Sequence, residues 1–367
     1  MTAAPPSSAR SWWLGALASA ALASLGAVLA LRLWKMSFSI PLRSSGDIML
    51  SLQTVRTMQL SGWYLHTDLL GAPLGQDLRA YPGGSGDLWN MVALKAFSLF
   101  LSPAAAVNAF FLIGFPVIAA VTFLCLRQLR VSWWSAVALG AVYSWIPYHF
   151  LRGEGHLFLA AYAAVPIACL LVLAVLNRRL ELGRGGRRLW LAAGGAAVLL
   201  GGTGLYYAVF AAVLLVSAGT LASIVARRWR PLLSGVALAS TSAVVMVLGS
   251  LPTVLYVLVH GSPGVEGRSY AAVEYYGLKL TSLLMPVQSH RIHIFAQLRA
   301  RLAESYIPGE NMEALGLVGA AGLVLVVAAA LIASRKTPLG RDLRRIGVVA
   351  LIAFVWATVA GLSGVLA

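Results

Sequence analysis

The sequence predicts a single all-α membrane domain over residues 1–367, with about nine transmembrane helices and interfacial helices in its first outer loop. Three observations predict this fold class. Hydrophobic residues make up 59% of the chain and charged residues 11%, whereas soluble domains are typically about 45–50% apolar. Long apolar runs alternate with short charged segments, and positive charge collects in every second connection between them.

The apolar runs define the predicted spans, because a helix needs about 20 mostly apolar residues to cross a bilayer. We expect spans at 12–34, 104–126, 132–150, 157–177, 189–203, 205–226, 231–259, 312–333 and 346–366. The first run is interpreted as a retained span, since it is longer than the apolar part of a signal peptide and no small-residue cleavage site follows it. The stretch 189–226 is divided at Gly201-Gly202-Thr203-Gly204 because glycines interrupt helices; one long tilted helix is the alternative.

The distribution of charge predicts how these spans are oriented. With the N-terminus in the cytoplasm, the cytoplasmic segments carry 16 of the 28 basic residues and only Glu181 and Asp342 as acids. The opposite side carries the remaining 12 basic and 10 acidic residues, as the positive-inside rule requires. Because topology explains most of the net charge of +16, membrane lipids are expected partners and nucleic acid is not.

Two outer segments are too long to be plain connectors, one at about 35–103 and one at about 260–311. In the first, an uneven apolar stripe after Asp47 predicts a short helix lying in the membrane interface, and a second short helix is expected at about 88–101. Glycine- and proline-rich turns are expected at 71–75 and 81–86. All six histidines fall on or near this face, so any chemistry is expected there.

The first candidate for chemistry is Asp47, which ends the tripeptide Ser45-Gly46-Asp47 directly before the predicted interfacial helix. A carboxylate at the membrane surface can take a proton from an acceptor hydroxyl, which is general-base catalysis. The alternative is an N-cap, in which the aspartate accepts hydrogen bonds from the first free N–H groups of the helix. The two roles are compatible.

A second candidate is the segment Arg152-Gly153-Glu154-Gly155-His156, which connects two strongly apolar spans. Arg152 would suit a phosphate, whereas Glu154 and His156 would hydrogen-bond a sugar, bind a metal or orient a base. The alternative is a solvated loop in which Arg152 and Glu154 satisfy each other, because polar residues at a membrane edge cost little.

A third candidate lies in the late outer segment, where Lys279 precedes His290, Arg291 and His293. Fixed cations of this kind stabilise the negative charge that develops on a departing diphosphate. The spacing of the two histidines does not by itself indicate a metal site.

These segments together resemble the bacterial integral-membrane glycosyltransferases of the GT-C superfamily. The resemblance rests on Ser45-Gly46-Asp47, Gly71-Ala72-Pro73-Leu74-Gly75, Arg152 through Phe158, and Leu284-Met285-Pro286 through His290-Arg291. It implies a helical membrane core, interfacial helices in the first outer loop, and an acidic residue near the end of the first span that acts as base or metal ligand. Asp47 is the residue that matches this acid.

The resemblance implies transfer of a sugar from a polyprenyl-phosphate or polyprenyl-diphosphate carrier to a glycan, lipid or protein acceptor outside the cytoplasm. It places the protein in the bacterial inner membrane. Together with the one-sided distribution of titratable groups, it leads to the hypothesis that Asp47 and Glu154 are the catalytic residues. Arg152, His156, Lys279, His290 and Arg291 would bind the substrate. Metal dependence varies within the superfamily, so a divalent metal is left open. Relatives usually continue with further spans, so a truncated or split chain is one interpretation that the resemblance leaves open.

Two other classes of protein compete with this interpretation. A transporter or flippase for a lipid-linked or anionic solute would place ionisable groups inside the spans, but the predicted span interiors are nearly free of charge. A non-catalytic membrane scaffold is the third interpretation, and the polar clusters of the outer face argue against it only weakly.

Overall fold

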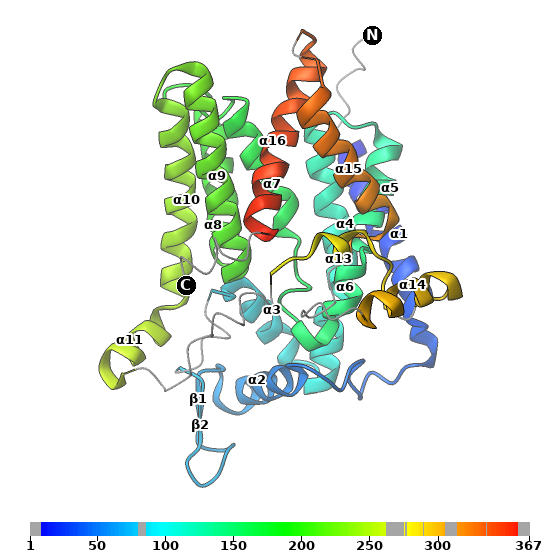
Figure 1. The fold of residues 1–367 in the computed structure, drawn as a ribbon. Coiled ribbons are helices and arrows are strands. Elements are labelled where there is room, and N and C mark those ends of the chain that lie inside the picture. Colours follow the sequence, from blue (N-terminus) through cyan, green and yellow to red (C-terminus); the bar gives the residue numbers. More distant parts are fainter. Residues whose placement is uncertain are drawn as a thin grey trace.

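A computed structural model describes residues 9–79, 86–261, 275, 277–288, 290–304, 314–334 and 336–358 of the chain. The described part is mostly helical, with one two-stranded sheet. Four of its helices are long and apolar enough to cross a membrane: α1 (Ala9–Leu31), α4 (Pro103–Gln128), α9 (Leu205–Ala226) and α10 (Arg230–Gly249). The fold is therefore that of an all-α protein with four candidate membrane spans, and Figure 1 shows them running roughly parallel.

The remaining elements complete the architecture. They are η1 (Leu33–Lys35), α2 (Ile48–Ser61), β1 (His66–Thr67), β2 (Gln76–Asp77), α3 (Leu88–Ser98), α5 (Trp133–Ser144), α6 (Pro147–Arg152), η3 (Gly153–His156), α7 (Ala164–Leu176), α8 (Arg187–Gly201), α11 (Leu251–His260), α13 (Leu280–Leu284), α14 (His293–Glu304), α15 (Gly316–Ile332) and α16 (Pro338–Thr358). The predicted turn at 81–86 lies almost entirely outside the described residues, as does the end of the last predicted span after 358.

Helices α1, α4 and α5 pack closely because small residues line their contacts. A Cβ added at Gly140 would lie 2.4 Å from the Ser19 Oγ and 2.7 Å from the Ala119 carbonyl oxygen. Ser19 donates a hydrogen bond to the carbonyl of Val137 over 3.0 Å. Small residues that let backbones approach are the usual means of joining helices in a membrane, where burying apolar surface against lipid gains nothing.

Helices α7, α8, α9 and α10 form a second group around a shared apolar core. The predicted division of the 189–226 stretch is confirmed, since α8 ends at Gly201 and α9 begins at Leu205. Gly204 has φ of +118°, which a side chain would oppose, and its N–H donates to the carbonyl of Gly86 over 2.9 Å. The break between α8 and α9 therefore contacts the first outer loop at Gly86.

Two predicted spans are divided at prolines, and their predicted boundaries are wrong. The span expected at 231–259 consists of α10 and α11, which meet at Ser250 just before Pro252. The span expected at 132–150 consists of α5 and α6, with Pro147 at the start of α6. Proline lacks the N–H that continues a helix, and its ring disfavours the helical conformation in the residue before it.

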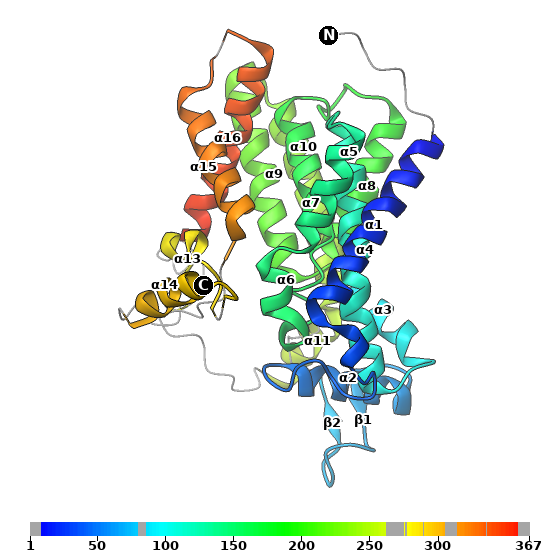
Figure 2. The ribbon, with the colours of Figure 1, turned by 90° about the vertical axis from the view of Figure 1, so that its right-hand side faces the viewer.

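Three further predicted spans correspond to shorter or shifted helices. The span expected at 157–177 is reduced to α7, which begins only at Ala164 because 153–160 form short turns. The spans expected at 312–333 and 346–366 correspond to α15 and to the described part of α16. These two helices pack together at one side of the molecule with α13 and α14 below them (Figure 2).

The two helices expected in the first outer loop are confirmed as α2 and α3. They lie at the lower end of the bundle, where α2 runs across the helix axes (Figure 1). Ile48 and Val55 of α2 are buried against α4, and Met58 packs on Met91 of α3. The apolar stripe of α2 thus packs against the protein.

Candidate functional site

The first and second candidate segments lie against each other at the lower end of the bundle. The Asp47 Oδ2 is 3.3 Å from the His156 Nδ1, and the backbone N–H of Asp47 donates to the carbonyl of Gly155 over 2.8 Å. The Asp47 side chain is 60% exposed and the His156 side chain 28% exposed. A carboxylate and an imidazole from segments about a hundred residues apart therefore form an accessible pair.

Asp47 stands at the N-cap position of α2, but its side chain makes no capping hydrogen bond. The carboxylate faces His156 instead, while the Asp47 carbonyl oxygen accepts from Ser51 in the first turn of the helix over 3.0 Å. Asp47 therefore occupies the N-cap position, as the alternative predicts, but its carboxylate does not cap the helix. The carboxylate has no structural task within the helix.

Two glycines allow the segments to meet. A Cβ added at Gly46, which has φ of +75°, would lie 2.8 Å from the Gly155 carbonyl oxygen. A Cβ added at Gly155 would lie 2.9 Å from the carbonyl oxygen of Ser45. Both separations are shorter than carbon–oxygen contacts normally are, so this unit of 45–47 and 153–156, here called the junction, requires glycine in both segments.

Glu154 is held behind the junction rather than beside Arg152. Its Oε2 accepts a hydrogen bond from the backbone N–H of Arg43 over 3.1 Å, and Glu154 is only 1% exposed. Its Oε1 is buried without a hydrogen-bond partner among the described residues. Burial raises the pKa of this carboxyl, and the hydrogen bonds from the Arg43 and Leu42 backbone offset part of the increase.

Arg43 is a site residue that sequence reasoning missed. Its backbone holds Glu154, and its guanidinium Nη1 donates to the carbonyl of Leu151 over 2.7 Å. Only its position two residues before Ser45 could have drawn attention to it, because a single arginine after a span usually indicates topology.

A cavity of about 330 Å³ opens beside Glu154. Its lining includes the charged residues Arg43 and Glu154 and, beside Gly153, the apolar residues Leu31, Met36, Leu42, Phe111 and Phe150. The cavity thus combines a buried carboxylate and a cation with a hydrocarbon surface. A ligand with a polar group joined to an apolar part matches this lining.

Arg152 lies at the junction's edge but turns toward an aromatic ring. Its guanidinium carbon is 5.6 Å from the centroid of the Tyr148 ring, a cation–π geometry. The Tyr148 hydroxyl lies 3.4 Å from that of Tyr207 on α9. The described hydrogen bond of the Glu154 carboxylate comes from the Arg43 backbone. The alternative of a solvated loop, in which Arg152 and Glu154 satisfy each other, is therefore not what the described contacts of Glu154 show.

The late outer segment does not join this group. Lys279 donates to the carbonyl of Gly277 over 2.9 Å, His290 accepts from the Ile292 N–H over 3.0 Å, and Arg291 is exposed. No described contact connects these side chains to Asp47, Glu154 or His156, and Figure 2 shows α13 and α14 on the opposite side from α1. Of the seven predicted site residues, the structure brings together Asp47, Arg152, Glu154 and His156 and leaves Lys279, His290 and Arg291 apart.

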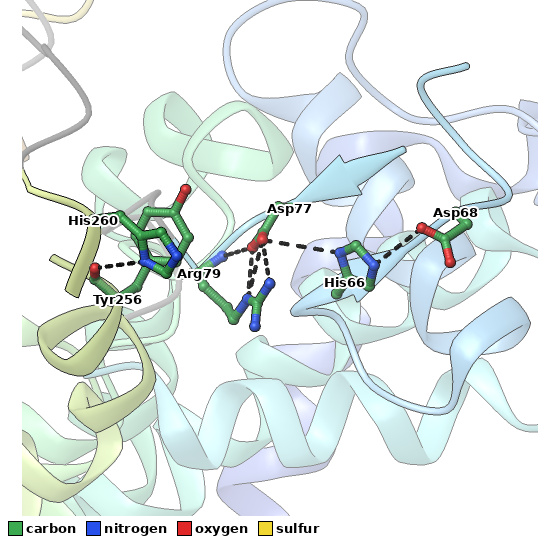
Figure 3. Close-up of polar contacts among 6 residues, drawn as sticks. All are labelled: His66, Asp68, Asp77, Arg79, Tyr256 and His260. Atoms are coloured by element: carbon green, nitrogen blue, oxygen red, sulfur yellow. Dashed lines mark hydrogen bonds and ion pairs between the residues drawn. The ribbon is translucent and has the colours of Figure 1, made fainter. Parts of the chain in front are cut away.

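A second polar group surrounds the β1–β2 hairpin (Figure 3). His66 lies between two carboxylates, with Nε2 at 3.1 Å from the Asp68 Oδ1 and Nδ1 at 3.9 Å from the Asp77 Oδ2. Because the carboxylates face opposite edges of the ring, they do not converge on a single ion. Among the residues that the structure describes, no group of three or more His, Cys, Asp or Glu side chains is arranged to hold a metal.

Comparison with family models, with curated proteins and with solved structures found no match to this chain. The class of protein therefore has to be inferred from the junction, the cavity and the membrane-type helices.

Proposed function

We propose that the protein is a membrane glycosyltransferase of the GT-C type, which moves a sugar from a polyprenyl-(di)phosphate carrier to an acceptor outside the cytoplasm. The observation that carries the proposal is the accessible Asp47–His156 pair, 3.3 Å apart. The neighbouring residues Gly153 and Glu154 line a cavity whose other lining residues include Arg43 and several apolar side chains. A lipid-linked sugar likewise combines a polar head with a hydrocarbon tail.

In the proposed reaction, Asp47 is the general base. The oxygen of an acceptor hydroxyl attacks the anomeric carbon of the donor sugar, and its proton passes to the Asp47 carboxylate. The bond between the anomeric carbon and the phosphate oxygen breaks, and the carrier phosphate leaves with the electron pair. His156 orients the carboxylate. Arg152, at the edge of the junction, has its guanidinium over the Tyr148 ring and is proposed to turn from that ring to face the departing phosphate.

The proposal revises the role of Glu154. Its carboxylate is buried and accepts a hydrogen bond from the backbone N–H of Arg43. Glu154 therefore positions the segment of the first outer loop that carries Asp47. Its second oxygen remains for a donor group of the substrate, such as a sugar hydroxyl, because Glu154 lines the cavity. Lys279, His290 and Arg291 have no step in this scheme.

The proposal includes the finer topology: about nine spans, a cytoplasmic N-terminus and the bacterial inner membrane. The basic segments on one side support the orientation. In the four candidate spans the charged residues stand only at the ends, Arg10, Arg127 and Arg230, which fits a reaction at the surface better than a transport path through the bundle.

The test is mass spectrometry of lipid-linked sugars and envelope glycans in cells that carry the wild-type protein, Asp47→Asn or Asp68→Asn. Asp68 is the matched control, because it is an exposed aspartate of the same outer loop, away from the junction. We expect a lipid-linked sugar to accumulate with Asp47→Asn and to be consumed with Asp68→Asn. Normal consumption with a stably inserted Asp47→Asn protein would contradict the proposal.

The role of a divalent metal is tested separately, with purified protein in nanodiscs. Transfer measured with a chelator, and again after addition of Mg²⁺ or Mn²⁺, decides whether a metal takes part. Only protein side chains take part in the proposed reaction, so transfer should continue in the presence of the chelator.

A further inference from the structure

Helix α11 presents an unusually regular apolar face to the outside of the molecule. Leu251, Val254, Leu255, Leu258 and Val259 follow the i, i+3, i+4, i+7, i+8 spacing of one helix face. Their exposed fractions are 39%, 41%, 52%, 76% and 76%, and no α11 residue is buried. A stripe of this kind is costly in water, so it has a partner other than water.

The position of α11 indicates what that partner is. It follows α10 with a break of one residue at Ser250, and α10 is a candidate membrane span. With 20 residues, α10 is about 30 Å long, which is the thickness of the hydrocarbon core. The chain therefore reaches the membrane surface where α11 begins, and Figure 1 shows α11 turned outward there.

The apolar surface of α10 continues into α11. Val244, Val247 and Leu248 at the end of α10 are 58%, 51% and 61% exposed. If lipid covers these residues, as the spanning role of α10 requires, the same lipid continues onto Leu251 and Leu255.

The opposite face of α11 is held by the first outer loop (Figure 3). The Arg79 guanidinium carbon lies 5.7 Å from the centroid of the Tyr256 ring, and Tyr256 stacks on His260 with ring centroids 4.4 Å apart. Asp77 of β2 binds the same guanidinium, with its Oδ1 3.0 Å from the Arg79 Nε. The polar face is thus fixed to the hairpin, which leaves the apolar stripe directed outward.

We propose that α11 is an interfacial helix, whose stripe of Leu251, Val254, Leu255, Leu258 and Val259 lies in the outer leaflet, and that Arg79 anchors it through Tyr256. The occupant is the lipid surface itself, with the stripe buried roughly 5–10 Å into the boundary between headgroups and acyl chains. The hairpin is thereby held at the membrane surface. This proposal is independent of the glycosyltransferase activity.

The test uses single cysteines labelled with an environment-sensitive fluorophore in nanodiscs, in a Cys125→Ala, Cys169→Ala background. Leu258→Cys and Val259→Cys probe the stripe, and Arg56→Cys on the exposed face of α2 is the control. We expect labels at 258 and 259 to emit at shorter wavelength and to be quenched by nitroxide lipids labelled near the top of the acyl chain. The label at 56 should be quenched by aqueous iodide.

Two outcomes would overturn the proposal. Quenching of both stripe labels by iodide, without quenching by lipid, would mean that α11 lies in water. Protection from both quenchers would mean that protein covers the stripe, with a second copy of the chain as the occupant, which crosslinking of the same cysteines would detect.

The anchor is tested with Arg79→Gln and the matched Arg79→Lys, each combined with Leu258→Cys. Lysine keeps the cation above the Tyr256 ring, whereas glutamine removes it. Spin-label mobility at 258 should increase with Arg79→Gln and stay near the wild-type value with Arg79→Lys. Equal mobility in all three proteins would exclude the anchoring role.

Discussion

Helices α2 and α11 are both short, lie at the same end of the bundle and carry an apolar stripe, yet they use it in opposite ways (Figure 1). In α2, Ile48, Val55 and Met58 are at most 1% exposed and pack on α3 and α4. In α11, Leu258 and Val259 are each 76% exposed. Periodicity therefore identifies the apolar face of a helix but does not say whether protein or lipid covers it.

The largest effect that separates the two helices is expected from an aspartate placed in each stripe. Val55→Asp puts a carboxyl at a position with no exposed surface, at a cost of roughly 2–7 kcal/mol, and should abolish folding. Val259→Asp places its carboxyl at the membrane interface and not in the protein core, so it should cost only about 1 kcal/mol or less. Thermal unfolding followed by size-exclusion chromatography measures both, and a comparable loss in the two variants would remove the distinction.

The next effect concerns the glycines on either side of α2. Gly46→Ala and Gly62→Ala each place a side chain at positive φ, +75° and +82°, which costs about 1–2 kcal/mol. Only Gly46→Ala also meets a backbone oxygen at 2.8 Å, since nothing lies within 4 Å of a Cβ at Gly62. Gly46→Ala should therefore lose transfer activity by separating Asp47 from His156, whereas Gly62→Ala should keep it at a reduced melting temperature. Equal activity in the two variants would show that the close approach is not required.

The sequence was sufficient to predict α2, α3, the break at 201–204 and the polar segments of the outer face, because each depends on local pattern. It did not predict the breaks at Pro147 and Pro252, since long apolar runs conceal a proline that only redirects a helix. Nor did it predict that Arg43 holds Glu154 or that Lys279, His290 and Arg291 lie apart from the junction. Contacts between segments about a hundred residues apart depend on helix packing, which local pattern does not encode.

A third prediction concerns pH, and Glu154 and Asp77 should respond with opposite sign. Burial raises the pKa of Glu154 above the unfolded value of 4.5, so its folded form binds the proton more tightly and stability falls as pH rises through the folded pKa. Glu154→Gln should thus gain stability relative to wild type on going from pH 4 to pH 8. The hydrogen bonds from Arg79 lower the pKa of Asp77 below 3.8, so the stability it contributes is present at neutral pH and lost as pH falls through the lowered value.

The measurement for this prediction is the melting temperature of wild type, Glu154→Gln and Asp77→Asn across that pH range and further into acid. A difference between Glu154→Gln and wild type that does not change with pH would mean that the carboxyl of Glu154 titrates as in the unfolded chain. A destabilisation by Asp77→Asn that persists unchanged at the most acidic pH would have the same meaning for Asp77.

The smallest effect is expected at the contact between α11 and the hairpin. Tyr256→Leu removes the ring beneath Arg79 and should cost about 0.5–1 kcal/mol of unfolding free energy, the usual value for an exposed cation–π pair. Tyr256→Phe retains the ring and serves as the matched control. Denaturant unfolding in mild detergent measures both, and equal stabilities would mean that the Arg79–Tyr256 contact contributes nothing.

The most direct test of the junction is a double-mutant cycle on Asp47 and His156, measured as sugar transfer in nanodiscs. Loss of a general base should slow transfer by about 10²–10⁴-fold. Because the two side chains are 3.3 Å apart and are proposed to act as one unit, Asp47→Asn with His156→Gln should be no slower than Asp47→Asn alone. If the double variant is slowed by the product of the two single fold-changes in transfer rate, the two residues do not form a shared site. Unchanged transfer in Asp47→Asn would contradict the proposed chemistry.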